Sequence, residues 1–166
     1  MPVIGALGLQ GVSVKHITFL LVFTLVGCVS TPPKAINEFY NGKYAVRDLS
    51  SAYTPKETHE LLFTELVKCY QREISSIIPI PTVNAAIKVS QSSFVEYNIL
   101  PNGTRQLALV GEAGWNRFYQ QLIEIKSTND NSTLVQVYEI SSAWEKHTSR
   151  IAGWLNGKEA EGCGVW

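Results

Sequence analysis

Hydrophobic residues recur at helical spacing between about residues 55 and 74 of this 166-residue chain. Such a stripe is typical of a helix that packs one face against a core. The stripe consists of Leu62, Leu66, Cys69 and Tyr70. Thr54, Pro55 and Glu57 provide a capping hydroxyl, a first-turn proline and a capping-box carboxylate, so the helix should begin at residue 55. The prolines within residues 77–81 cannot continue a helix interior, so the helix should end before them.

The hydrophobic pattern changes to a period of about two between residues 85 and 140, as expected for strands with one buried face. The runs with this pattern are residues 87–89, 95–99, 105–112, 117–126 and 133–140. A Pro-Asn-Gly-Thr turn at residues 101–104 joins two of them, which should therefore pair antiparallel. The pattern predicts an antiparallel meander sheet of four or five strands.

A second helix is predicted at about residues 143–155. Ser142 and Glu145 repeat the capping-box pattern, and Asn156 and Gly157 supply a C-terminal stop. A helix, a run of strands and a second helix in this order predict an α+β fold. We expect both helices to pack on one face of the sheet.

The N-terminal part of the chain contains an uncharged apolar run at residues 17–27, behind a short basic flank. Its length fits the core of a signal peptide, about 7–15 residues, and is short of the ~20 residues that a transmembrane helix needs. The run ends in Leu25-Val26-Gly27-Cys28, which resembles the lipobox of bacterial lipoproteins. This resemblance implies that residues 1–27 are a signal peptide and that Cys28 is acylated. An uncleaved amphiphilic anchor is the alternative interpretation.

The same resemblance implies a cell-envelope protein held to a membrane by the lipid on Cys28. Val29 is not the aspartate that retains lipoproteins at the inner membrane of enterobacteria, so in a Gram-negative host we expect the outer membrane, facing the periplasm. A translation start at Val12 or Val14 would give a leader of ordinary length and is an alternative to Met1. We expect residues 28–51 to be a lipidated tether and lead-in with one short strand-like stretch, Tyr44-Ala45-Val46, and residues 52–166 to be a single α+β domain.

Two cysteines follow the one in the lipobox, Cys69 and Cys163. Disulfides persist on the exported side of a membrane, and two cysteines make one bridge. We therefore predict a Cys69–Cys163 disulfide, with two separate thiols as the alternative. Neither cysteine has a second ligand at the spacing of a metal site, so no metal is predicted.

The charges of the chain balance, with 14 basic and 14 acidic residues. There is no basic tract or nucleic-acid-binding motif, so nucleic acid is not an expected partner. The serine pairs lie in turns or caps, no glycine-rich loop joins a strand to a helix, and His59 and His147 have no carboxylate at a spacing that suggests catalysis. The sequence therefore predicts neither a catalytic residue nor a cofactor.

Four tryptophans are the remaining candidates for a site. Trp144 and Trp154 lie on the apolar stripe of the second helix, so we expect them to fill the core. The candidates for a binding surface are Trp115 and the terminal Trp166. Trp115 lies near Gly111 and Gly114, where a bulge or a break between strands is expected.

These observations favour a non-catalytic binding or assembly module that docks another envelope protein or peptidoglycan. Two alternatives stay open. The chain could be a lipidated inhibitor that protects against an exported enzyme, presenting a loop such as residues 98–104, or a small envelope hydrolase with an unrecognised site. An exposed aromatic cleft would favour the binding module, whereas a histidine with a carboxylate in a concave pocket would favour the hydrolase.

Overall fold

The computed structural model describes residues 31–80, 85–128, 132–158 and 163. The chain divides into two units, residues 1–31 and 32–166, and the fold below is that of the second unit. Its elements are η1 (Ile36–Asn41), β1 (Ala45–Ser51), α2 (Pro55–Tyr70), β2 (Arg72–Ile80), β3 (Ala85–Ile99), β4 (Arg105–Ala113), β5 (Asn116–Ser127), β6 (Thr133–Glu139), η2 (Ser142–Trp144) and α3 (Glu145–Leu155). The expected α+β class is confirmed.

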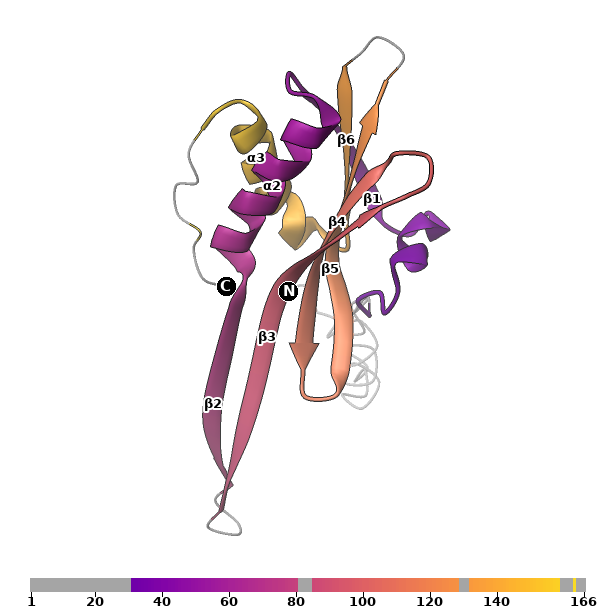
Figure 1. Cartoon of the computed structure of the whole chain (residues 1–166). Coiled ribbons are helices and arrows are strands. Elements are labelled where there is room, and N and C mark those ends of the chain that lie inside the picture. Colours follow the sequence, from indigo (N-terminus) through magenta and orange to yellow (C-terminus); the bar gives the residue numbers. More distant parts are fainter. Residues whose placement is uncertain (1–30, 81–84, 129–131, 159–162, 164–166) are drawn as a thin grey trace, which may run out of the picture. The chain divides into compact units, whose positions relative to one another are not determined.

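The strands form one antiparallel sheet in the order β1-β6-β5-β4-β3-β2 (Figure 1). From β2 to β6 each strand pairs with its neighbours in sequence, which is the predicted meander. β1 adds at the far edge beside β6. The sheet therefore has six strands rather than the four or five expected.

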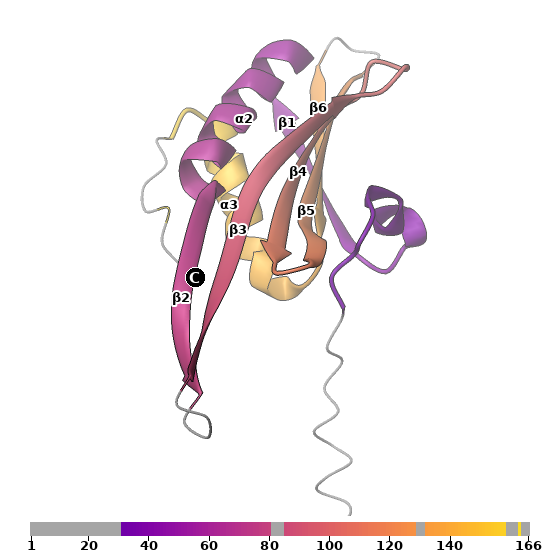
Figure 2. The same ribbon diagram turned by 60° about the horizontal axis from the view of Figure 1, so that its bottom comes forward.

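The helices α2 and α3 lie on one side of the sheet, and the 3-10 helix η1 lies on the other (Figure 2). Because side chains alternate along a strand, Leu107 and Leu109 of β4 point to the helix side and join the core beneath the helices. The same core takes Leu62 and Leu66 from α2 and Trp154 from α3. On the other side, Phe39 of η1 is buried in a smaller cluster.

Residues 36–51 belong to the segment that the sequence predicts to be a tether and lead-in. They form η1 and β1, and β1 pairs with β6 over its whole length. The strand is longer than the strand-like stretch predicted at residues 44–46, because its later residues have little apolar pattern: Leu49 is its one apolar side chain that packs on the core. The sheet therefore begins before residue 52, the expected start of the domain.

The helix α2 begins where the sequence predicts but ends at Tyr70 rather than near residue 74. The following residues form β2, which pairs with β3 from Arg72 to Ile80. Prolines in residues 77–81 are compatible with an edge strand as well as with a helix end. The β-branched isoleucines of this run favour the strand.

The second helix begins differently from the prediction. A short 3-10 turn, η2, precedes α3, so Ser142 lies inside the turn instead of capping a helix. Neither Ser141, before η2, nor Trp144, before α3, makes a side-chain capping bond. The predicted capping box at Ser142 is therefore wrong, whereas the one at Thr54 is confirmed by reciprocal bonds with Glu57.

This difference between the two helix starts can be measured. Thr54→Ala should lower the free energy of unfolding by about 1 kcal/mol because it removes an N-cap that accepts from the amide of Glu57. The matched variant Ser142→Ala should change it by less than ~0.5 kcal/mol. Urea unfolding followed by circular dichroism compares the two, and equal losses would contradict the assignment of the caps.

The Cys69–Cys163 disulfide predicted from the sequence is present. The two α-carbons are 4.8 Å apart, within the range of about 4.4–6.8 Å that a disulfide allows. Cys69 lies in the core at the end of α2, and Cys163 packs against the edge of that core. The bond therefore holds the segment after α3 against the folded unit.

Candidate binding surface

Trp115 lies in the two-residue turn between β4 and β5. The pair Ala113 and Asn116 closes the turn, and Gly114 has a positive φ of 59°, which glycine adopts without the steric cost of a side chain. The indole of Trp115 is fully exposed. The structure thus places this candidate residue at the surface, on a turn fixed at both ends by the sheet.

A groove of about 560 Å³ lies beside this tryptophan, and we call it the Trp115 groove. Its lining residues are Glu73 from β2, Lys88, Ser90 and Ser92 from β3, and Glu112, Gly114 and Trp115 from β4 and its turn. The register places Glu73 opposite Ser92, and Ser92 opposite Glu112, so three strands contribute to one surface. An exposed indole is therefore surrounded by hydroxyls and by charges of both signs.

One wall of the groove is restrained by Arg117 of β5, which lies opposite Glu112 in the sheet. Its guanidinium pairs with Glu96 and, at 3.7 Å, with Glu112. It also lies 5.5 Å from the centre of the Phe94 ring, a cation–π distance. Exposed ion pairs add little stability, so the main effect of Arg117 is to place a positive charge beside Glu112 at the edge of the groove.

The sheet next to the groove contains a β-bulge opposite Leu109 and Val110. Past this bulge the ring of Phe118 lies over Gly111, where an added Cβ would be only 2.6 Å from the ring. A larger residue at 111 would therefore require the Phe118 ring to move. The structure therefore contains both features that the glycines around Trp115 indicate: a bulge between β4 and β5, and the break between these strands at residues 114–115.

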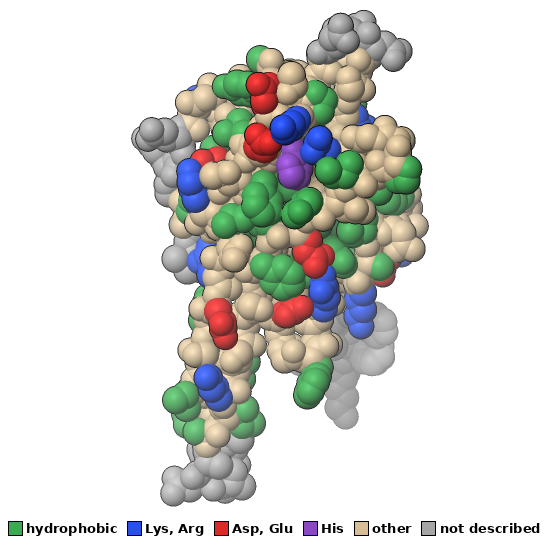
Figure 3. All heavy atoms as spheres, viewed as in Figure 1, with side chains coloured by type: hydrophobic (Ala, Val, Ile, Leu, Met, Phe, Trp, Pro, Cys, Tyr) green, Lys and Arg blue, Asp and Glu red, His purple; other side chains and the backbone are tan. Residues whose placement is uncertain are grey.

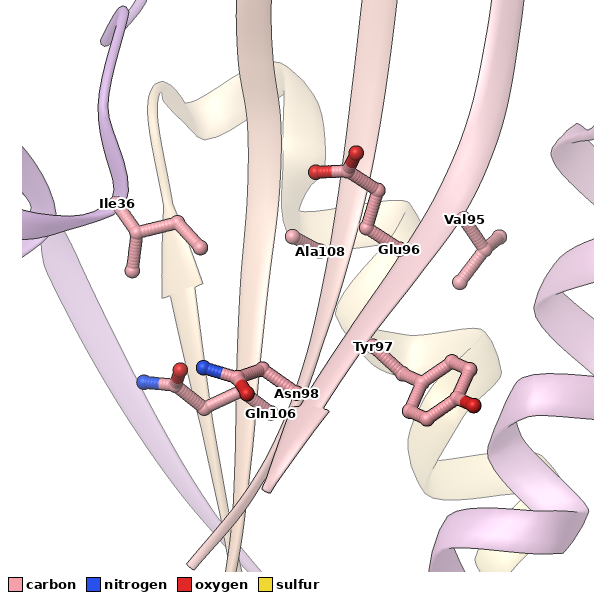
Figure 4. Close-up of a pocket in the computed structure, with 7 residues that line it drawn as sticks. All are labelled: Ile36, Val95, Glu96, Tyr97, Asn98, Gln106 and Ala108. Carbon is pink, nitrogen blue, oxygen red and sulfur yellow. The ribbon is translucent and has the colours of Figure 1, made fainter. Parts of the chain in front are cut away.

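A second hollow, of about 390 Å³, lies between η1 and the β3–β4 strands. Figure 4 shows Ile36, Gln106 and Ala108 on one side of the strands, whereas Tyr97 points away from them towards the helices. Gln106 belongs to a buried network: its amide donates to Glu124 at 2.9 Å and to the hydroxyl of Tyr40 at 2.7 Å.

This network accounts for the polar residues beneath η1. Tyr40 donates to Glu124 at 2.7 Å, Tyr138 donates at 3.2 Å, and Lys126 pairs with the same carboxylate at 2.6 Å. Burial alone would raise the pKa of Glu124, but the bonds from Lys126, Tyr40 and Gln106 hold that pKa below its usual range. Burial and the Glu124 charge raise the pKa of Tyr138 to about 12. The carboxylate is occupied by protein partners, so it anchors η1 to the sheet.

The two histidines in the described part of the chain, His59 and His147, are held in packing contacts. His59 of α2 stacks on Phe63 and meets the edge of the Tyr97 ring. His147 of α3 is buried, with Nδ1 2.5 Å from the Tyr70 hydroxyl, and burial lowers its pKa to about 4. Within the described part of the chain, no group of three His, Cys, Asp or Glu side chains could hold a metal ion.

Comparison with known proteins gives no family for this chain. No protein-family model matches it, and no curated protein matches it. The function is therefore argued from the geometry of the folded unit and from the lipobox resemblance.

Two of the residues singled out in the sequence, Cys28 and Trp166, lie outside the described residues. Trp144 and Trp154 are buried in the core beneath the helices, as predicted. Neither α2 nor α3, the two α-helices of the described ranges, has the length and hydrophobicity that crossing a membrane requires.

Sequence reasoning did not identify the residues of β2 and β3 that line the Trp115 groove. The sequence pattern predicts a helix at Glu73, whereas its place in the groove depends on pairing with Ser92, nineteen positions further along the chain. The available signal was the run of isoleucines and serines at residues 74–78, whose β-branched residues are typical of a strand.

Proposed function

We propose that the chain is a membrane-anchored, non-catalytic lipoprotein of the cell envelope that binds another envelope protein through the Trp115 groove. The observation that carries this proposal is the full exposure of Trp115 beside a groove lined by three strands. Tryptophan is the residue type most enriched among residues that dominate binding energies, and burying it in a complex removes a large apolar surface from water.

The surroundings of Trp115 support a protein partner. Lys88, Glu73 and Glu112 supply charges of both signs around one apolar side chain, which is the usual composition of an interface with an apolar centre and a polar rim. The turn that carries Trp115 ends in paired strands, so the backbone at position 115 is held by the sheet before a partner binds. Such pre-organisation reduces the entropy lost on binding.

The binding role can be tested in the full-length lipoprotein in its native membrane. A photo-crosslinking amino acid at position 115 should capture a discrete partner, whereas the same group at Tyr53, an exposed aromatic residue before α2, should not. Trp115→Ala should weaken partner recovery at least about tenfold, as expected for a hot-spot residue, while Tyr53→Ala should leave recovery unchanged.

The identity of the captured protein separates the open functions. An assembly protein of the envelope supports the proposal, and an exported enzyme that the bound chain inhibits supports the inhibitor alternative. Unchanged recovery of the same proteins by Trp115→Ala would exclude the Trp115 groove as the binding site.

The anchoring part of the proposal rests on Cys28. Three acyl chains, each contributing ~0.8 kcal/mol per buried methylene, would make membrane attachment effectively permanent. Metabolic labelling with a fatty-acid analogue should mark the wild-type chain and not Cys28→Ala. Labelling of Cys28→Ala at the wild-type level would contradict this assignment, and membrane fractionation of the labelled protein tests the proposed outer-membrane location.

A further inference from the structure

A hollow of about 460 Å³ lies between the edge strand β1 and the helix α3, and we call it the β1–α3 hollow. It is lined by residues 46–49 of β1, by Glu139 of β6, and by Glu145, Thr148, Ser149 and Ala152 of α3. Leu49 packs on the core beneath the helices, so the side chain of Arg47, two positions earlier on β1, points to the same side. The hollow therefore opens on the helix side of the sheet.

Glu139 is the buried acidic residue of this hollow. Its side chain is 3% exposed, and its Oε2 is 3.7 Å from Nε of Arg47, which is longer than a hydrogen bond. The other carboxylate oxygen, Oε1, is buried and has no hydrogen-bond partner among the described residues. Burying a carboxylate costs free energy unless the group is paired and hydrogen-bonded. Glu139 therefore has capacity for a further donor.

The polar residue beside Glu139 is also incompletely bonded. Gln121 of β5 lies directly opposite Glu139 in the sheet and is fully buried. Neither its amide nitrogen nor its amide oxygen has a hydrogen-bond partner in the described part of the chain. Nearly all buried polar groups of folded proteins make such bonds. Two neighbouring exceptions therefore mark this end of β5 and β6 as a place where a polar molecule is accommodated.

The polar side chains of α3 in the hollow can accept further hydrogen bonds but not donate them. Ser149 donates its hydroxyl hydrogen to the carbonyl of Glu145 at 3.0 Å, and Thr148 donates to the carbonyl of Trp144 at 3.5 Å. A hydroxyl has a single hydrogen, so each of these oxygens has only lone pairs left. The Glu145 carboxylate, 68% exposed, is a further acceptor. A ligand in the hollow therefore meets acceptors from both β6 and α3.

The ionised side chains of the hollow also leave an excess of negative charge. Arg47 lies between the two carboxylates, 3.7 Å from Glu139 and 3.9 Å from Glu145, and one guanidinium cannot neutralise both. Asp48 points to the other side of the sheet, where it accepts from Gln136. On the face shown in Figure 3, by contrast, most acidic side chains lie beside a Lys or Arg side chain. The charge of the hollow thus favours a cation.

We propose that the β1–α3 hollow binds a primary alkylammonium group, which donates to Glu139 and to the hydroxyl oxygens of α3. An ammonium group has three donors, no acceptor and one positive charge, which matches the acceptors and the charge around it. An organic cation is favoured over a metal ion because no three His, Cys, Asp or Glu side chains of the described ranges could hold one. The alkyl chain would lie against Leu49 and Ala152.

This binding site goes beyond the proposed function and does not depend on it. Val95 of β3 packs on the core beneath the helices, so Ser92 of the Trp115 groove, three positions away, points to the other side of the sheet. The groove and the hollow therefore open on opposite sides. Trp115→Ala should leave binding in the hollow unchanged.

Binding can be measured by NMR spectroscopy of the isotope-labelled full-length lipoprotein in detergent micelles. The probe is butylammonium, and the matched probe is butanol, which has the same alkyl chain without the charge. Butylammonium should shift the backbone amide signals of residues 47–49 and 148–152 in a saturable way. The dissociation constant should be in the millimolar range, as expected for a ligand of so few atoms. Butanol should cause no saturable shift.

Substitutions in the hollow test which groups hold the ammonium. Glu139→Gln keeps the shape of the side chain and removes its charge, so it should raise the dissociation constant at least about tenfold. Glu145→Gln should raise it about threefold, and its exposed position keeps the test independent of folding. Arg47→Gln should lower it about threefold, because it removes a competing cation. Glu60→Gln, which removes an exposed charge from α2, is the control and should leave it unchanged.

The same titration with Nα-acetyl-lysine amide distinguishes two sources of the ammonium group. Tighter binding of the lysine derivative than of butylammonium supports a lysine side chain of a peptide, and weaker binding supports a free amine. Shifts from butanol equal to those from butylammonium would overturn the proposal. So would the absence of a saturable shift, or a wild-type dissociation constant in Glu145→Gln.

Discussion

Cys163→Ala should lower the free energy of unfolding by about 4–5 kcal/mol, the value that the chain-entropy model gives for a loop of this length. The disulfide joins residues separated by 94 positions, and this loop contains five of the six strands and α3. Its removal enlarges the conformational freedom of the unfolded chain. It also releases the segment that Cys163 holds against the core. Urea unfolding monitored by tryptophan fluorescence measures the loss.

The reduced wild-type protein is the matched control, since it loses the same bond without a change in sequence. Its stability should equal that of Cys163→Ala. Cys69→Ala should be less stable than either, because Cys69 is 3% exposed and its replacement also leaves a cavity in the core. A stability of Cys163→Ala within ~0.5 kcal/mol of the oxidised wild type would show that the bond does not restrain the unfolded chain.

The parts of the fold that could be predicted carry local signals. Thr54 and Glu57 define the start of α2 through contacts within one turn, and the period of two defines the central strands β3 to β6. The disulfide could be predicted because only two cysteines follow the lipobox. In each of these cases the residues on which the prediction depends are close in sequence or few in number.

The edge strands could not be predicted because their stability comes from a neighbour distant in sequence. β1 pairs with β6, for example Ala45 with Glu139, and it has few buried apolar side chains to indicate a strand. In residues 77–81 the prolines indicate a helix end and the isoleucines favour a strand, and the pairing of β2 with β3 decides between them. η1 is stabilised by Phe39 and by Tyr40, which donates to Glu124 across 84 positions.

Of the candidate site, the sequence identifies Trp115 but not the groove residues around it. The glycines near Trp115 indicate a bulge or a break between strands, and connections between strands lie at the surface. The groove depends on the alignment of Glu73, Ser92 and Glu112 across three strands. That alignment follows from the registers of two hairpins, and neither register can be obtained from the hydrophobic pattern alone.

Trp154→Ala should lower the free energy of unfolding by about 3–5 kcal/mol, as expected for removing a buried aromatic side chain. Trp154 of α3 is 3% exposed and packs in the core that joins both helices to the sheet. The change removes apolar burial and leaves a cavity in the core that the surrounding side chains cannot fully close. Urea unfolding of the oxidised protein, with circular dichroism as the readout, gives the value.

Trp115→Ala is the matched variant, because it makes the same substitution at a fully exposed position. It should change the stability by less than ~0.5 kcal/mol, since the exposed indole buries almost no surface in the folded unit. The two variants therefore separate the tryptophan that stabilises the fold from the one available to a partner. A loss of stability in Trp115→Ala comparable to that in Trp154→Ala would mean that Trp115 is buried within the folded chain, and the proposed binding role of the groove would then have no basis.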